Sequence, residues 1–195
     1  MWTDGKALSS RSMTLPGNAE WNLHYARWVI DDGEPERHVG ETFEWFAVDF
    51  WPDSAMVQSV ETTKSAIPIA DNAYRVNAEV ICISDDTKLA SCILDFGLRA
   101  ICDGANVLPP GCQKGDYVTG ELRLGLPLCA SVSSDELTYR WRVNKVSADL
   151  TPYVLDPTKR FRIRDVSAIE YDDVSGTEAV KGKGYVLHCS QLSRE

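Results

Sequence analysis

The sequence has few of the signals that mark membrane proteins or secreted proteins. No stretch approaches the roughly 18 consecutive apolar residues that cross a bilayer as a helix. Residues 1–6 do not place a basic segment before an apolar one, so they do not predict a secretory signal. We therefore expect a protein that has no membrane partner and lies in the cytoplasm.

Catalytic and metal-binding motifs are missing as well. The chain has no Gly-x-Ser-x-Gly turn, no phosphate-binding Gly-Lys-Ser/Thr loop and no His-Glu-x-x-His zinc motif. Its six cysteines form no Cys-x-x-Cys pair, and most lie in or beside strand-like runs, where a free thiol packs as a small hydrophobe. We expect no metal and no cofactor, and a protein that is not an enzyme is the favoured interpretation.

An enzyme interpretation would depend on carboxylates within apolar runs or on a histidine. Glu44, Asp49 and Asp95 lie in such runs, where a buried carboxyl has a raised pKa and can transfer protons. Each is more often a satisfied charge at a strand edge. His188 stands beside Cys189, but neighbouring residues of a strand point to opposite faces, so adjacency does not make them a catalytic pair. The enzyme is therefore the third choice.

What the sequence has in abundance is alternation of apolar and polar residues with a period of two, which is typical of strands with one buried face. The runs are 21–30, 73–84, 88–102, 115–126, 138–146, 160–171 and 184–192. Residues 41–51 are apolar on both faces, which predicts a central strand or one partly covered by another element. Residues 66–72 contain a proline and predict a loop. We expect a mostly β fold with little helix, a compact antiparallel barrel or sandwich of about 8–9 strands.

The length and the N-terminal composition predict the domain organisation. A chain of 195 residues suits one large domain. Residues 1–19 have little periodic apolar content and predict a loosely held arm, which leaves 20–195 as one β domain with a candidate internal boundary near 103–114. The segment Gly115-Asp-Tyr-Val-Thr-Gly120 resembles the opening strand of oligonucleotide-binding (OB-type) barrels, where a Gly-Asp turn leads into a strand bent at a glycine. The resemblance covers one strand; it implies a barrel and nothing about function.

Negative charge and tryptophan are both concentrated in the first part of the chain. Residues 1–110 contain 8 Lys and Arg against 17 Asp and Glu, a net charge of −9, whereas residues 111–195 contain 12 of each kind. Five of the six tryptophans lie in the first 51 residues. Most tryptophans should be buried, because each removes a large apolar area from water. Aromatic anchors among carboxylates also suit the docking of a basic protein.

These observations predict a non-catalytic binding protein whose acidic, Trp-rich N-terminal half docks a protein partner, which we expect to be basic. The role would be that of an inhibitor, an immunity-type protein or an adaptor. The candidate partner-binding residues are Trp28, Asp31, Asp32, Glu34, Glu36, Glu41 and Glu44.

A rival interpretation comes from arginines in the later strand-like runs. They are Arg123, Arg140, Arg142, Arg160, Arg162 and Arg164. If their strands are neighbours, these side chains form a basic face that could follow a phosphate backbone, so nucleic-acid binding is the alternative function. The arginines could instead pair with carboxylates across strands, or meet the acidic half in the same chain or in a second copy as a homo-oligomer. The overall acidity makes nucleic acid the less favoured partner.

Overall fold

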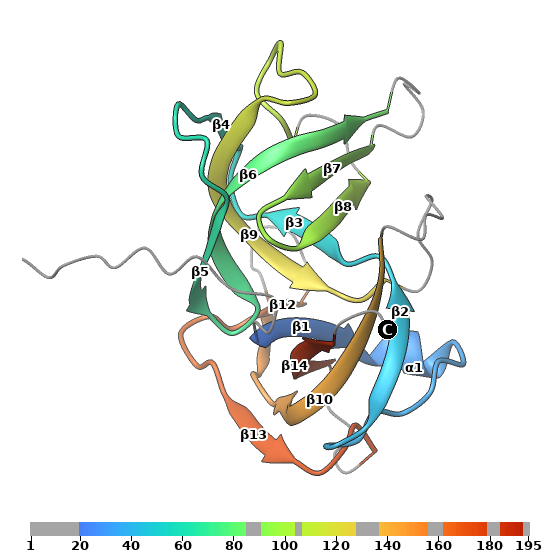
Figure 1. The fold of residues 1–195 in the computed structure, drawn as a ribbon. Helices are drawn as coiled ribbons and strands as arrows, with labels where there is room; N and C mark the ends of the chain where they lie inside the picture. The colour runs from blue at the N-terminus through green and yellow to red at the C-terminus, as the bar shows by residue number, and fades with distance from the viewer. Residues whose placement is uncertain are drawn as a thin grey trace, which may run out of the picture.

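The computed structural model describes residues 20–84, 91–103, 107–127, 137–155, 162–178 and 184–192. Within these ranges the chain is mostly strand, with one five-residue helix, α1 (Arg27–Asp31) (Figure 1). The strands are β1 (Glu20–Ala26), β2 (Thr42–Phe46), β3 (Asp49–Pro52), β4 (Val57–Gln58), β5 (Ser65–Ala70), β6 (Ala73–Ile83), β7 (Ser91–Asp95), β8 (Arg99–Asp103), β9 (Tyr117–Gly125), β10 (Thr138–Asp149), β11 (Tyr153–Leu155), β12 (Arg162–Arg164), β13 (Tyr171–Val174) and β14 (Gly184–Leu192). The prediction of a mostly β fold with little helix is confirmed.

Five strands close into a barrel, which forms the upper half of Figure 1. Strands β6, β7 and β8 form an antiparallel meander, and β9 returns to pair with β6, so the four make a Greek key. Strand β3 closes the barrel because it pairs with β8 in parallel and with β9 in antiparallel orientation. A five-stranded Greek-key barrel is the architecture of the OB fold. Here the closing strand β3 precedes the other four in the chain.

The sheet continues beyond the barrel into the lower half of Figure 1, and we call this continuation, made of β1, β14, β10, β13 and β2, the second sheet. The end of β9 pairs in parallel with β1, and β14, β10 and β13 follow in that order, while β2 pairs with β10. Strands β1 and β14 are in register from Glu20–Ser190 to Ala26–Gly184. Strands β11 and β12 form a separate two-stranded sheet. No helix among the described residues is long and apolar enough to cross a bilayer.

One apolar core cluster contains residues of the barrel and of the second sheet. Trp21 on β1 is buried, and its ring centroid lies 5.4 Å from that of Tyr74 on β6 and 5.9 Å from that of Phe96, in the turn after β7. Aromatic pairs at such distances stabilise a core beyond their buried area alone. The indole of Trp21 therefore packs the second sheet against the barrel.

Two runs that predict single strands are each divided by a turn. Residues 41–51 form β2 and β3, because Ala47 between them has a φ of 64° and redirects the chain. Residues 88–102 contain β7 and β8, which pair as a hairpin around Gly97 with a φ of 101°. Apolar residues continue on both sides of each turn, so the pattern alone does not show the turns.

Other boundaries also differ from those that the sequence predicts. The strand predicted at 21–30 ends at Ala26 and α1 begins at the next residue. The predicted run 160–171 contains the short strand β12, and β13 begins only at its last residue, Tyr171. Residues 66–72 were expected to form a loop, but most of them belong to β5 at the sheet edge, where Pro68 needs no ladder hydrogen bond on its outer side. The predicted arm, 1–19, lies outside the described residues. The candidate boundary near 103–114 falls between β8 and β9 of one barrel.

The barrel interior yields a first prediction. Leu122 on β9 is fully buried in the core, whereas Val60 is fully exposed. We expect Leu122→Ala to lower the free energy of unfolding by about 2–5 kcal/mol, because it removes apolar contacts and leaves a cavity. Val60→Ala is the control and should change it by less than about 0.5 kcal/mol. Urea unfolding followed by circular dichroism measures both, and equal effects would contradict the inward position of Leu122.

Candidate functional site

The outer faces of β1 and β3 meet at the end of β9. Gly125 on β9 is in register with His24 on β1 and with Asp49 on β3. Alternate residues of a strand share a face, so Ala26 lies on the same face as His24, and Trp51 on the same face as Asp49. Side chains of β1 and β3 therefore converge around Gly125, which has no side chain of its own.

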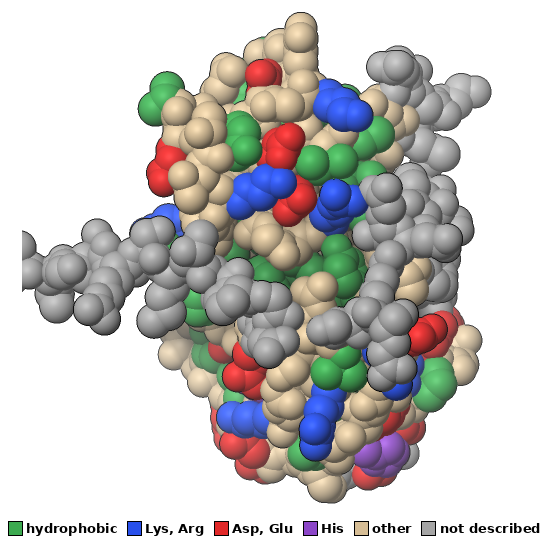
Figure 2. Space-filling view, viewed as in Figure 1, with side chains coloured by type: hydrophobic (Ala, Val, Ile, Leu, Met, Phe, Trp, Pro, Cys, Tyr) green, Lys and Arg blue, Asp and Glu red, His purple; other side chains and the backbone are tan. Residues whose placement is uncertain are grey.

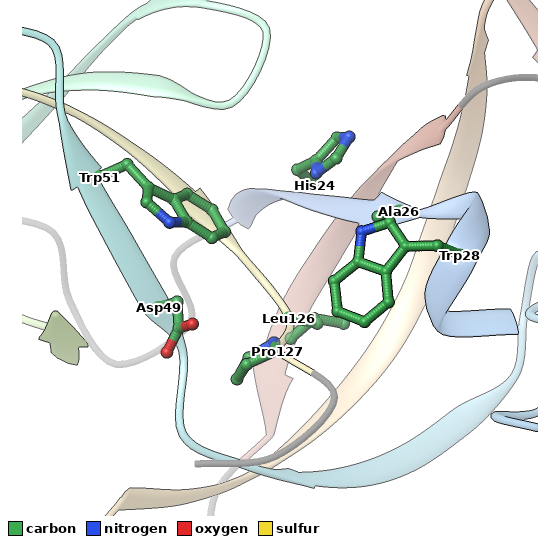
Figure 3. A pocket seen from close by; sticks show the side chains of 7 residues that line it. All are labelled: His24, Ala26, Trp28, Asp49, Trp51, Leu126 and Pro127. Atoms are coloured by element: carbon green, nitrogen blue, oxygen red, sulfur yellow. The ribbon is translucent and has the colours of Figure 1, made fainter. Parts of the chain in front are cut away.

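These side chains line a pocket of about 530 Å³, shown in Figure 3. Trp28 from α1 supplies another wall, and Leu126 and Pro127 follow directly after β9. In Figure 3 the indoles of Trp28 and Trp51 lie on opposite sides of the pocket, and the carboxylate of Asp49 lies on the side of Trp51. The volume is within the range of about 300–1,000 Å³ that small ligands occupy. We call this site the Trp28–Trp51 pocket.

The two tryptophans of this pocket are exposed, unlike the other described tryptophans. Trp28 is 55% exposed and Trp51 is 45% exposed, whereas Trp21, Trp45 and Trp141 are buried. The prediction that most tryptophans are buried is therefore confirmed for the described residues. Both exceptions line one pocket, and exposed tryptophan is enriched at the centre of protein interfaces.

The absence of a side chain at Gly125 allows the Trp51 ring to lie where it does. A β-carbon at Gly125 would be 2.7 Å from Cζ3 of Trp51, 2.8 Å from Cη2 of Trp51 and 3.0 Å from the carbonyl oxygen of His24. These separations are shorter than van der Waals contact. The amide of Leu126 donates a hydrogen bond to the same carbonyl at 2.9 Å. The backbone of β9 is therefore held against β1, and the Trp51 ring covers it.

His24 is largely buried at one side of the pocket, and its pKa is below the usual value for histidine. Burial is the main cause, because it disfavours the charged imidazolium, and the positive charges of Arg164 and Arg123 act in the same direction. The carboxylate of Asp149 opposes them with a smaller effect than that of burial. The imidazole is therefore neutral at neutral pH and adds no positive charge to the pocket.

Two of the predicted partner-binding carboxylates adjoin the Trp28 wall. Asp31 and Asp32 follow Trp28 at the i+3 and i+4 positions, which are neighbours on a helical turn. The amide of Asp32 donates a hydrogen bond to the carbonyl oxygen of Trp28 at 2.9 Å. Both side chains are exposed, and Asp31 pairs with Arg27 at 2.9 Å. Asp32 and the Arg27–Asp31 pair therefore lie next to Trp28 on the chain, and the carboxylate in the pocket lining itself is Asp49.

The remaining predicted carboxylates lie elsewhere, and two of them are bound within the chain. Glu41 accepts hydrogen bonds from Arg37 Nη1 at 2.7 Å and from the amide of His38 at 2.9 Å. Glu36 accepts a hydrogen bond from the hydroxyl of Thr177. Their charges hold the loop between α1 and β2 in place. The other two are Glu34, which is half-buried, and Glu44, which is exposed on β2.

The described arginines of the rival interpretation lie on strands that are not neighbours. Arg123 is on β9, Arg140 and Arg142 are on β10, and Arg162 and Arg164 are on β12. Strands β14 and β1 separate β10 from β9, and β12 belongs to the smaller sheet. Arg123 pairs with Asp53 at 3.0 Å and Arg164 with Asp149 at 3.1 Å. On the face shown in Figure 2, positive and negative side chains lie beside one another. Arg160 lies outside the described residues.

A second, more polar pocket of about 360 Å³ includes the groups that an enzyme interpretation would use. The Ser147 hydroxyl lies 3.0 Å from a carboxylate oxygen of Asp173 and 3.1 Å from Nε2 of His188. Hydrogen bonds from Lys145 and Ser147 lower the pKa of Asp173, so its ionised carboxylate takes the single hydroxyl proton. His188 then donates to the serine instead of accepting its proton. This arrangement differs from a catalytic triad, in which the carboxylate orients the histidine.

Asp95, one of the candidate acid–base residues, is held by cations. It lies 3.0 Å from Lys64 Nζ and 3.4 Å from Arg99 Nε. Burial favours its neutral form, but the hydrogen bonds from the amide of Gly97 and from Lys64 outweigh that effect, and its pKa is lowered. Among the described residues no three His, Cys, Asp or Glu side chains gather as a metal site.

A scan against models of protein families and searches of curated proteins and of solved structures found no match to this chain. The site therefore has to be interpreted from its own geometry. Sequence reasoning found Trp28 and named Asp49 only as a candidate acid–base residue. It missed Trp51 and Gly125 as site residues. The spacing of Asp49 and Trp51 at i and i+2 was the available signal, because it puts an acid and an indole on one strand face.

The close approach at Gly125 yields a second prediction. Gly125→Ala should displace the Trp51 ring and lower the free energy of unfolding. In a Trp51→Ala background the same change should cost about 0.5–3 kcal/mol less, because the indole is gone while the contact with the His24 carbonyl remains. Urea unfolding of the wild type, both single variants and the double variant gives this coupling. Additive costs would contradict the packing of Trp51 over Gly125.

The lowered pKa of His24 yields a third prediction. As the pH is lowered, His24 of the unfolded chain gains a proton near pH 6.5, the ordinary histidine pKa. Folded His24 gains its proton only at a lower pH. The free energy of unfolding should therefore fall as the pH is lowered from above 6.5 through the folded pKa. His24→Gln should reduce this slope, and His38→Gln, at a more exposed ring, is the control. Urea unfolding between about pH 7 and pH 5 tests this, and an unchanged slope in His24→Gln would contradict it.

Proposed function

We propose that this protein is a non-catalytic binding module that docks a basic protein partner at the Trp28–Trp51 pocket. One observation carries the proposal. The exposed indoles of the described residues lie on opposite sides of a single pocket, with Asp49 in its lining and with Asp31 and Asp32 three and four residues after Trp28. An aromatic pocket with carboxylates in its lining and beside one of its tryptophans complements a basic, partly apolar surface.

The rings and the carboxylates contribute to binding in different ways. Tryptophan gives a large apolar contact at little cost in side-chain entropy, which is why it is enriched in binding hot spots. Carboxylates around such anchors speed the approach of positively charged partners and disfavour acidic ones. The net charge of −9 supports the same choice of partner.

A module of this kind acts by covering or tethering a basic surface. We propose an inhibitor, immunity-type or adaptor role, in the cytoplasm. The free thiols of Cys82, Cys112 and Cys189 support a reducing compartment. Nucleic-acid binding has less support, because the described arginines are spread over separate strands and two of them are paired with carboxylates.

A fourth prediction tests the docking function with a short lysine-rich peptide as the probe. We expect the peptide to bind and to quench tryptophan fluorescence, with an affinity that falls as salt is added. Trp28→Ala, and separately Asp31→Asn with Asp32→Asn, should weaken binding about tenfold or more. A glutamate-rich peptide of equal length and a single-stranded oligonucleotide are the comparison probes.

Two matched variants control this experiment. Val60→Ala trims an exposed apolar side chain away from the pocket, and Glu61→Gln removes an exposed negative charge away from it. Neither should change the affinity for the lysine-rich peptide. The proposal is overturned if Trp28→Ala binds as tightly as the wild type, or if the oligonucleotide binds more tightly than the peptide.

A further inference from the structure

We propose that the Trp28–Trp51 pocket receives the N-methylated ammonium group of a lysine side chain on the partner. The inference rests on the proposed docking function and specifies which group of the partner enters the pocket. It follows from the chemistry of the pocket walls: two indoles, one carboxylate and a set of apolar side chains.

The two indoles favour a cation between them. The face of an aromatic ring carries negative electrostatic potential, and indole attracts cations more strongly than phenol or benzene rings do. Trp28 and Trp51 come from different elements and lie on opposite sides of the pocket, so a cation in the pocket has an indole on either side (Figure 3). Aromatic walls of this kind are a known means of binding methylated ammonium groups.

The other walls favour a methylated ammonium over an unmodified one. An unmodified lysine ammonium has three N–H donors, and a donor removed from water without an acceptor costs free energy. Ala26, Leu126 and Pro127 line the pocket with apolar groups, while Asp49 supplies a negative charge. Methyl groups in place of the N–H donors match apolar walls, and the positive charge that remains matches the carboxylate.

The charge of the site opposes the main competing ligand. A nucleobase could stack between two indoles. Its phosphates would then lie near Asp49, the carboxylate in the lining. His24 is neutral and offers no compensating positive charge. The volume of about 530 Å³ also exceeds that of one ammonium group, which leaves room for the methylene stem and the adjoining backbone of a peptide.

A fifth prediction uses three versions of the lysine-rich peptide that differ at one central residue. That residue is lysine, trimethyllysine, or an uncharged analogue that carries a tert-butyl group in place of the trimethylammonium group. We expect the trimethyllysine peptide to bind more tightly than the other two, and about 2- to 30-fold more tightly than the uncharged analogue, since only the charge differs. Isothermal titration calorimetry measures the three affinities.

Variants of the pocket connect this preference to its walls. Trp51→Ala should abolish the preference for trimethyllysine, and Trp51→Phe should keep part of it, because a benzene ring attracts cations less strongly than indole. Asp49→Asn should weaken binding of the trimethyllysine peptide more than that of the uncharged analogue. Val60→Ala and Glu61→Gln should leave all three affinities unchanged, and circular dichroism shows whether each variant is folded.

The outcomes separate this inference from the docking function. If the three peptides bind equally, and all weaken in Trp28→Ala, the docking function stands and the inference about methylated lysine is wrong. If the uncharged analogue binds as tightly as trimethyllysine, the pocket recognises shape alone and the inference is wrong. If no peptide binds but free choline binds more tightly than its uncharged tert-butyl analogue, both the docking function and the lysine source are overturned.

Discussion

Strand β9 is the element on which both parts of the structure depend. It pairs with β6, β3 and β4 on the barrel side and with β1 in the second sheet. Such close contacts are possible because β9 has glycine where other segments lie against its backbone. A β-carbon at Gly120 would be 2.6 Å from Sδ of Met56, and one at Gly125 would be 2.7 Å from the Trp51 ring. Gly125 therefore lets β1 approach the backbone of β9, and it leaves space for the Trp51 ring that lines the pocket.

The acidic residues of the N-terminal half form two groups: some are paired within the chain and stabilise the fold, and others lie in or next to the pocket. Counting acidic residues in the sequence does not distinguish the two groups. The guanidinium of Arg37 is buried 4.3 Å from the ring centroid of Phe43 and is paired with Glu41. A buried charge of this kind needs its partner, because an unpaired charge away from water is strongly destabilising. The carboxylate of Glu41 therefore stabilises the fold by pairing with Arg37. Asp49 lines the Trp28–Trp51 pocket and Asp31 and Asp32 follow Trp28, so these are the carboxylates to which we assign the partner.

Local pattern predicted the strands because alternation depends on neighbouring residues, and the runs 73–84 and 115–126 contain β6 and β9. It failed where one backbone angle redirects an apolar run, as at Ala47. The pocket was harder to predict, because His24, Asp49 and Gly125 meet through strand pairing between segments far apart in the chain. The pairing and register of these strands follow from the closed barrel, and no short sequence motif encodes them. Trp28 was found because tryptophan beside carboxylates is visible in the sequence.

The exposure of Trp28 and Trp51 has a physical cost that the three buried tryptophans do not share. Burying an indole removes a large apolar area from water, and this chain does so at Trp21, Trp45 and Trp141. The Trp51 ring lies over Gly125, and Trp28 is on α1. The backbone therefore sets the separation of the two indoles, and contact between the rings does not. Two rings kept apart in this way lose the gain of mutual packing. A methylated ammonium group between them, as we propose, would restore part of it, because indole faces attract cations and Asp49 lines the same pocket.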